Sequence, residues 1–160
     1  MKSVEEYIKE HDFVVFVTCG YPGSGKTTWC RKTGLPNVSR DSIRNVAYVV
    51  PYDGDYKYEK SHGSEGEVTK YEYALIMNCY FMRKSFTIDD TNGTKWRKDL
   101  LRLLKSLGAY IVGINFDTPL EICSKRRIGK IQDFMMLYFK RHHKFITPDE
   151  VDELITLKGY

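Results

Sequence analysis

A glycine-rich run near the N-terminus constrains the fold more than any other feature of the chain. Residues 20–27 read Gly-Tyr-Pro-Gly-Ser-Gly-Lys-Thr and fit the pattern G-x-x-x-x-G-K-[ST] without a mismatch. A continuous β-rich run, Phe13–Thr18, precedes this loop, and the residues from Thr27 to Lys32 favour the opening of a helix. A loop of this composition between a strand and a helix is typical of phosphate binding. We therefore expect a phosphate-binding loop between a buried strand and a helix.

Each part of this loop has a chemical role. The glycines let successive backbone N–H groups point inward at phosphate oxygens, and the following helix adds the positive end of its dipole. Lys26 is expected to reach the β- and γ-phosphates, and the hydroxyl of Thr27 is expected to bind Mg²⁺. The predicted ligand is ATP or another NTP with Mg²⁺. The residues expected to bind it are Gly23, Ser24, Gly25, Lys26, Thr27 and Thr28.

Strand-like apolar runs alternate with helical stretches along the rest of the chain. This alternation predicts a parallel sheet flanked by helices, because parallel strands need crossover connections. We expect an α/β, P-loop NTPase-like fold in a single domain, residues 1–160. Ligands of such sheets bind at the carboxyl ends of the strands, so the residues after each strand are the functional candidates. Further strands are predicted at 37–39, 85–89, 109–116 and 154–157.

The composition excludes several classes of protein. With 42% hydrophobic and 29% charged residues, the chain is unlike both a disordered segment and a membrane protein. Its longest apolar run, Phe13–Val17, is far shorter than the roughly 20 residues that span a bilayer. The four cysteines lack zinc-finger spacing, which favours free thiols in a reducing compartment. We expect a cytoplasmic protein without membrane contact.

A carboxylate and a guanidinium follow the second predicted strand. Asp41 and Arg44 are three residues apart, so on a helix they share one face. Asp41 is placed to take the proton from an attacking hydroxyl, and Arg44 to bind a phosphate beside that hydroxyl. The alternative is a plain surface salt bridge, but the position past a strand favours the functional interpretation. We predict that this pair forms the phosphate acceptor site.

Two adjacent acids, Asp89 and Asp90, end the third core strand. An acid at this position of a P-loop protein commonly holds the loop hydroxyl or a water molecule on Mg²⁺. The alternative is an acid that only caps a helix or a turn. One of these two acids is therefore predicted to share the metal site with Thr27.

The positive charge of the chain is concentrated in one segment. Residues 125–144 contain seven Lys or Arg and one acid, a charge of +6, whereas the remaining 18 basic and 20 acidic residues sum to −2. Such a run is either a solvated helix face or a surface that faces phosphates. Next to a phosphate-binding loop and an acceptor pair, it favours a basic lid that closes over the triphosphate.

These elements together resemble the kinase domain of the bacteriophage polynucleotide kinase–phosphatase family. The resemblance covers nearly the whole chain, and the ordered set of motifs is much more specific than the loop alone. It rests on Gly20–Trp29, on the R-D-x-x-R element Arg40, Asp41 and Arg44, on the D-T-N element Asp90-Thr91-Asn92, on the basic lid Lys125–Lys130, on Tyr56-Lys57-Tyr58 and on Phe116-Asp117-Thr118-Pro119.

The resemblance implies transfer of the γ-phosphate of ATP to 5′-hydroxyl ends of DNA or RNA. It makes Asp41 the general base, Arg44 and Thr91 acceptor-binding residues, and Asp90 a structural or metal-positioning acid. Lys26 and a lid arginine become the catalytic cations. The family spaces its two lid arginines further apart, whereas Arg126 and Arg127 are adjacent here, and we favour Arg127 for this role.

The resemblance does not extend to the phosphatase. Asp53-Gly54-Asp55-Tyr56 differs from the D-x-D-G-T nucleophile element, so a stand-alone kinase is predicted, in the host cytoplasm if the gene belongs to a phage. Three other functions fit parts of the pattern. They are a kinase of a small hydroxyl substrate such as a nucleoside or sugar, a kinase of a hydroxymethylated base in DNA, and a nucleotide-binding switch or toxin-like module. The sequence predicts no oligomeric state.

Overall fold

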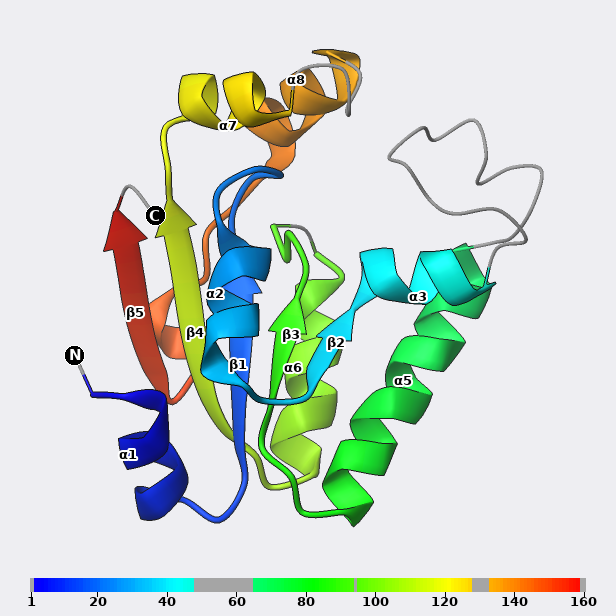
Figure 1. Ribbon diagram of the computed structural model, residues 1–160, viewed down its shortest axis with the longest axis vertical. Coiled ribbons are helices and arrows are strands. Elements are labelled where there is room, and N and C mark those ends of the chain that lie inside the picture. The colour runs from blue at the N-terminus through cyan, green and yellow to red at the C-terminus, as the bar shows by residue number, and fades with distance from the viewer. Residues whose placement is uncertain (1, 48–64, 94, 128–132, 159–160) are drawn as a thin grey trace.

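The computed structural model describes residues 2–47, 65–93, 95–127 and 133–158 of the chain. Five strands form one sheet in the order β2-β3-β1-β4-β5, and every neighbouring pair is parallel (Figure 1). The strands are β1 (Val14–Cys19), β2 (Asn37–Ser39), β3 (Phe86–Asp89), β4 (Tyr110–Asp117) and β5 (Glu153–Lys158). The expected α/β fold with a parallel sheet is therefore confirmed.

Helices cover both faces of this sheet and its upper edge (Figure 1). Because both faces are covered, β1 is buried at all six of its positions, and its sequence is an almost unbroken apolar run. The described helices are α1 (Val4–Glu10), α2 (Lys26–Thr33), α3 (Arg40–Ala47), α5 (Glu65–Phe81), α6 (Arg97–Ser106), α7 (Leu120–Arg126), α8 (Asp133–His142) and the short 3₁₀ helix η1 (Pro148–Glu150). None of the helices among these described residues is long and apolar enough to cross a membrane.

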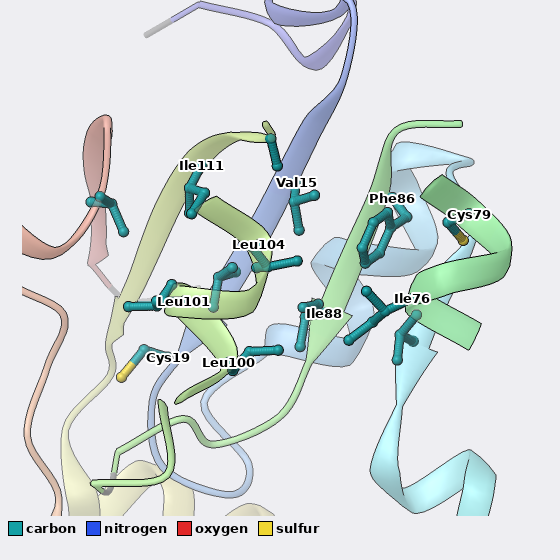
Figure 2. Packing of buried hydrophobic residues seen from close by; sticks show 14 of the residues in the cluster. Val15, Cys19, Ile76, Cys79, Phe86, Ile88, Leu100, Leu101, Leu104 and Ile111 are labelled. Carbon is teal, nitrogen blue, oxygen red and sulfur yellow. The ribbon is translucent and has the colours of Figure 1, made fainter. Parts of the chain in front are cut away.

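Alternate residues of the strands point into two separate hydrophobic clusters. On one face, Val15 and Ile88 pack with Ile76 of α5 and Leu104 of α6, as Figure 2 shows. On the other face, Phe16 and its neighbours on β4 pack against α1 and α2. The two clusters fix the sheet rigidly, and the loops after the strands meet at one edge below α7 and α8 (Figure 1).

The observed elements agree with the predicted ones in type and differ at some boundaries. The sequence favours an aperiodic loop at 52–66 and a helix from Val68 to Met82, whereas helix α5 begins at Glu65, so the last residues of that predicted loop are helical. The rest of that loop, including Tyr56-Lys57-Tyr58, lies outside the described residues. Helix α7 has Pro119 at its N-cap, and the hydroxyl of Thr118 donates to the carbonyl of Ser24 instead of capping the helix.

A buried arginine joins the segments that follow β3 and precede β5. Arg97 lies on α6 with only 7% of its surface exposed. Its guanidinium donates to the carbonyls of Asn92 (2.5 Å), Lys144 (2.7 Å) and Phe145 (3.2 Å). It also forms a salt bridge with Glu150, with 2.9 Å between Nη2 and Oε2. The charge is thus neutralised and its hydrogen-bonding capacity is used, which is the condition for burying an arginine stably.

Replacing Arg97 with alanine is expected to destabilise the fold strongly. The variant leaves Glu150 without its buried partner and three carbonyls without a donor, so we expect a loss of about 3 kcal/mol or more in the free energy of unfolding. Arg102→Ala on the same helix is the matched control, because Arg102 is 78% exposed and forms a surface ion pair with Asp99. The control should change stability by less than about 0.5 kcal/mol. Urea unfolding measures both values, and equal losses would contradict this role of Arg97.

Candidate active site

The phosphate-binding loop lies between β1 and α2, as the sequence predicts. Gly23 and Gly25 have φ angles of 84° and 105°, values that L-residues with a side chain rarely adopt. A Cβ atom on Gly23 would lie 2.8 Å from the carbonyl oxygen of Cys123 and 3.1 Å from Cγ of Arg127. The glycines therefore allow both the curvature of the loop and its close contact with α7.

Lys26 is enclosed by the loop that it belongs to. Its side chain is buried, and its ammonium donates to the carbonyl oxygens of Gly20 and Tyr21, both at 2.9 Å. Burial lowers the pKa of Lys26, and the carboxylates of Asp89 and Asp90 partly offset this effect. A buried cation held by loop carbonyls is able to exchange these weak partners for the oxygens of a phosphate.

The two acids at the end of β3, Asp89 in the strand and Asp90 just after it, have different neighbours. Burial raises the pKa of Asp89, and hydrogen bonding with the exposed Thr27 and the charge of Lys26 lower it. Burial also raises the pKa of Asp90, which Arg40 lowers through its charge. Asp89 is therefore the acid beside the loop hydroxyl. The assignment of Asp90 to a metal site stays a prediction, and Asp89 has the position that such a role requires.

The loop after β3 is attached to the phosphate-binding loop. Asp90 accepts a hydrogen bond from the backbone N–H of Thr91 at 2.7 Å, and the carbonyl of Thr91 accepts one from the N–H of Gly20 at 3.1 Å. Thr91 thus lies next to the loop, whereas Thr28 is an exposed residue in the first turn of α2. The predicted acceptor-binding role of Thr91 is not tested by these contacts.

Both predicted lid arginines lie beside the phosphate-binding loop. Arg126 donates from Nη1 to the carbonyl of Gly23 at 3.1 Å, and Arg127 approaches the same glycine with its aliphatic stem. The remaining lid residues, Gly129 and Lys130, lie outside the described residues. The end of α7 is therefore close enough for either arginine to contact phosphates bound in the loop.

The predicted acceptor pair is formed on α3 and includes a carboxylate that the sequence did not reveal. Nη1 of Arg44 lies 2.7 Å from Oδ1 of Asp41, whose carboxyl is 61% exposed. The opposite side of the same guanidinium binds Glu65 of α5 with two hydrogen bonds, both of 2.8 Å. Glu65 also pairs with Arg40 at 2.6 Å, and Arg40 pairs with the buried Glu72 at 2.6 Å.

Glu65 is held as a carboxylate by these two arginines. Burial alone would raise its pKa, but hydrogen bonds from Arg44 and Arg40 lower the pKa of Glu65 to about 2. Glu72 shows the reverse balance, because burial raises its pKa more than Arg40 lowers it. The only sequence signal for this pair was its spacing of seven residues, which places both acids on one face of a helix.

Comparison with known proteins identifies the family and the fold of the chain. The family model AAA_33, described as an AAA domain, matches residues 15–133, and the chain belongs to this family. A solved structure from Chloroflexus aurantiacus J-10-fl has a TM-score of 0.69 at 16% identity and covers 92% of this chain and 89% of its own. A sugar kinase from Janibacter sp. HTCC2649 has a TM-score of 0.60 at 17% identity over 91% and 85%.

A third similar structure has higher sequence identity over a smaller part of its own length. It is a chain of the Pnkp1/Rnl/Hen1 complex, with a TM-score of 0.57 and 26% identity over 72% of this chain and 40% of that chain. The fold is thus a P-loop kinase-like fold with a parallel five-stranded sheet.

The contact between the loop and α7 predicts the effect of a single methyl group. Gly23→Ala adds a collision with Cys123 to the strain of a positive φ angle, which is about 1 kcal/mol or more by itself. Gly34→Ala is the matched control, because φ at Gly34 is 68° but nothing lies within 4 Å of the added Cβ. We expect Gly23→Ala to lose binding of a fluorescent ATP analogue and Gly34→Ala to retain it. Equal binding by both variants would contradict the tight packing of the loop.

Proposed function

We propose that this chain is an ATP- and Mg²⁺-dependent polynucleotide 5′-hydroxyl kinase. The observation that carries the proposal is the fork of Arg44, which binds the carboxylate of Glu65 through two parallel hydrogen bonds beside Asp41. Arginine recognises phosphate with the same fork geometry as it does carboxylate. A guanidinium that holds an oxyanion next to a candidate base is the arrangement that an acceptor with a neighbouring phosphate requires.

The donor side of the proposal rests on the phosphate-binding loop. The backbone of residues 23–28, the ammonium of Lys26 and the hydroxyl of Thr27 fit a triphosphate, and the nearby Asp89 fits a water molecule on Mg²⁺. When bound, Mg²⁺ neutralises charge on the β- and γ-phosphates. Arg126 or Arg127 is placed to stabilise the charge that develops on the transferred group, because both adjoin Gly23.

The acceptor side assigns different tasks to the two residues of α3. Asp41 removes the proton from the 5′-hydroxyl, since its carboxyl is exposed toward solvent and held in place by Arg44. Arg44 binds the phosphate on the 3′ side of the first nucleoside and so positions the hydroxyl for attack. The similarity to a chain of the Pnkp1/Rnl/Hen1 complex and the charge of +6 on residues 125–144 support a nucleic-acid acceptor.

A kinase of a small hydroxyl substrate is the second candidate. The likeness to a sugar kinase favours it, because that protein shares the fold over most of both chains. Such an enzyme needs no phosphate on its acceptor and no basic surface beyond the donor site. The phosphorylation of a hydroxymethylated base in DNA would use the same donor site and the same base, Asp41, and differs only in the position of the acceptor hydroxyl.

Variants of Asp41 and Arg44 distinguish these functions. Asp41→Asn keeps the shape of the side chain but removes the base, so kcat should fall by about 10²–10⁴-fold for every acceptor. Arg44→Ala should raise KM for a 5′-OH oligonucleotide and for a nucleoside 3′-monophosphate far more than for a nucleoside. Steady-state transfer from labelled ATP to the three acceptors measures both effects. Equal losses on the nucleoside would contradict phosphate binding by Arg44.

The acceptor phosphate must replace Glu65 on Arg44, and this competition is measurable. Glu65→Gln removes the competing charge, so KM for the 5′-OH oligonucleotide should fall about fivefold, the scale of a partly exposed ion pair near 1 kcal/mol. Glu72→Gln is the control, because the carboxylate of Glu72 bonds the guanidinium of Arg40. An increase of KM in Glu65→Gln, with the fold intact by thermal unfolding, would show instead that Glu65 positions Arg44 for catalysis.

A further inference from the structure

The helix that follows the lid presents an unusual outer face. Helix α8 buries Met136 and Phe139, which are 7% and 9% exposed, and anchors one side to the protein. At 100° per residue, five exposed side chains lie together on the opposite side. This outer face of α8 consists of Phe134, Leu137, Tyr138, Arg141 and His142.

The large side chains of this face are more exposed than packing of the helix requires. Phe134 is 57%, Leu137 56% and Tyr138 47% exposed. The rings of Tyr138 and His142 lie 4.6 Å apart with 36° between their planes, so they form one continuous aromatic surface. Three large apolar side chains on one helix face mark an interaction site more often than a neutral surface.

Contacts place this face on the same edge of the molecule as the phosphate-binding loop. The residue after α8, His143, packs its ring against Tyr21 of the loop with 4.7 Å between centroids. The backbone N–H of Lys144 donates to the carbonyl of Gly93, at 2.9 Å, in the segment after β3. Figure 1 shows α8 beside α7, above the carboxyl ends of the strands. A strand whose 5′ end reaches a phosphate bound in the phosphate-binding loop is therefore able to extend along α8 with its following nucleotides.

The chemistry of the face selects one kind of partner. Exposed rings interleaved with cations bind single-stranded nucleic acid, because each base stacks on a ring while its phosphate meets a positive charge. A duplex keeps its base faces stacked inside and offers nothing to these rings. The surrounding segment has a charge of +6, which matches a polyanion.

We propose that the outer face of α8 binds the acceptor strand as single-stranded nucleic acid, by stacking of bases on Phe134 and Tyr138 next to Arg141. This inference rests on the proposed function and adds to it a preference for unpaired ends. The rings select strands with accessible bases, and Arg141 holds their backbone. Neither ring belongs to the donor or the acceptor site, so the chemical step does not depend on them.

Binding to two matched oligonucleotides tests the stacking. Fluorescence anisotropy compares oligothymidylate of about 12 nucleotides, within the span of single-strand-binding surfaces, with an abasic strand of equal length. Wild type should prefer the strand with bases by about tenfold. The double variant Phe134→Ala, Tyr138→Ala should lose this preference and bind the abasic strand as wild type does. Tyr138→Phe keeps the ring and should bind like wild type.

Control variants and a second assay separate the possible failures. Phe81→Ala and Trp96→Ala remove rings outside α8 that are even more exposed, 74% and 70%, and should leave both affinities unchanged. Phosphoryl transfer to a nucleoside 3′-monophosphate should survive in the double variant, and its absence in wild type would refute the proposed function instead. Unchanged oligothymidylate binding in the double variant would overturn the stacking proposal. A wild-type protein without a preference for bases, together with a double variant that loses binding to vesicles containing anionic lipid, would also overturn it and would point to a membrane surface instead.

Discussion

The rest of the active site depends on one buried charge, the ammonium of Lys26. It is stable inside the protein because the loop folds its own carbonyls around it and because Asp89 and Asp90 lie nearby. The same loop geometry requires glycine at position 23, where α7 leaves no room for a Cβ atom. Arg126 and Arg127 at the end of α7, Asp89 beside Thr27 and the phosphate-binding loop are thus grouped around a single cation at the carboxyl edge of the parallel sheet.

A second set of charged residues, on α3 and α5, lies at the same carboxyl edge of the sheet as Lys26. Arg40 and Arg44 of α3 are matched by Glu65 and Glu72 of α5, so the two helices are joined by ion pairs as well as by apolar contacts. Glu65 is half exposed and hydrogen-bonded to both arginines, and under the proposed function the acceptor phosphate takes its place on Arg44. Under this proposal, Arg44 exchanges the carboxylate of Glu65 for a phosphate and keeps a charged partner throughout. This exchange costs less free energy than leaving the guanidinium buried and unpaired.

The sequence was sufficient to predict the sheet, the loop and the pair on α3, because each has a strong local signal. It did not reveal Arg97, since an arginine on an amphipathic helix looks like a surface residue until distant carbonyls are brought around it. It also did not separate Asp89 from Asp90. Successive side chains at the end of a strand point to opposite faces of the sheet. Whether Asp89 or Asp90 is the acid beside the loop therefore depends on which of these faces meets Thr27. Glu65 was missed because the polar residues before it obscured the start of α5.

The proposed acceptor, a 5′-hydroxyl end of nucleic acid, is tested most directly by the transfer of labelled phosphate. Purified protein with Mg²⁺ and γ-labelled ATP is offered a 5′-OH oligonucleotide, the same strand already bearing a 5′-phosphate, a free nucleoside and DNA with hydroxymethylated bases. We expect label only on the 5′-OH strand, at its 5′ end, and complete loss of transfer in Lys26→Ala. Label on the nucleoside or on the modified bases, with none on the 5′-OH strand, would contradict the proposed function.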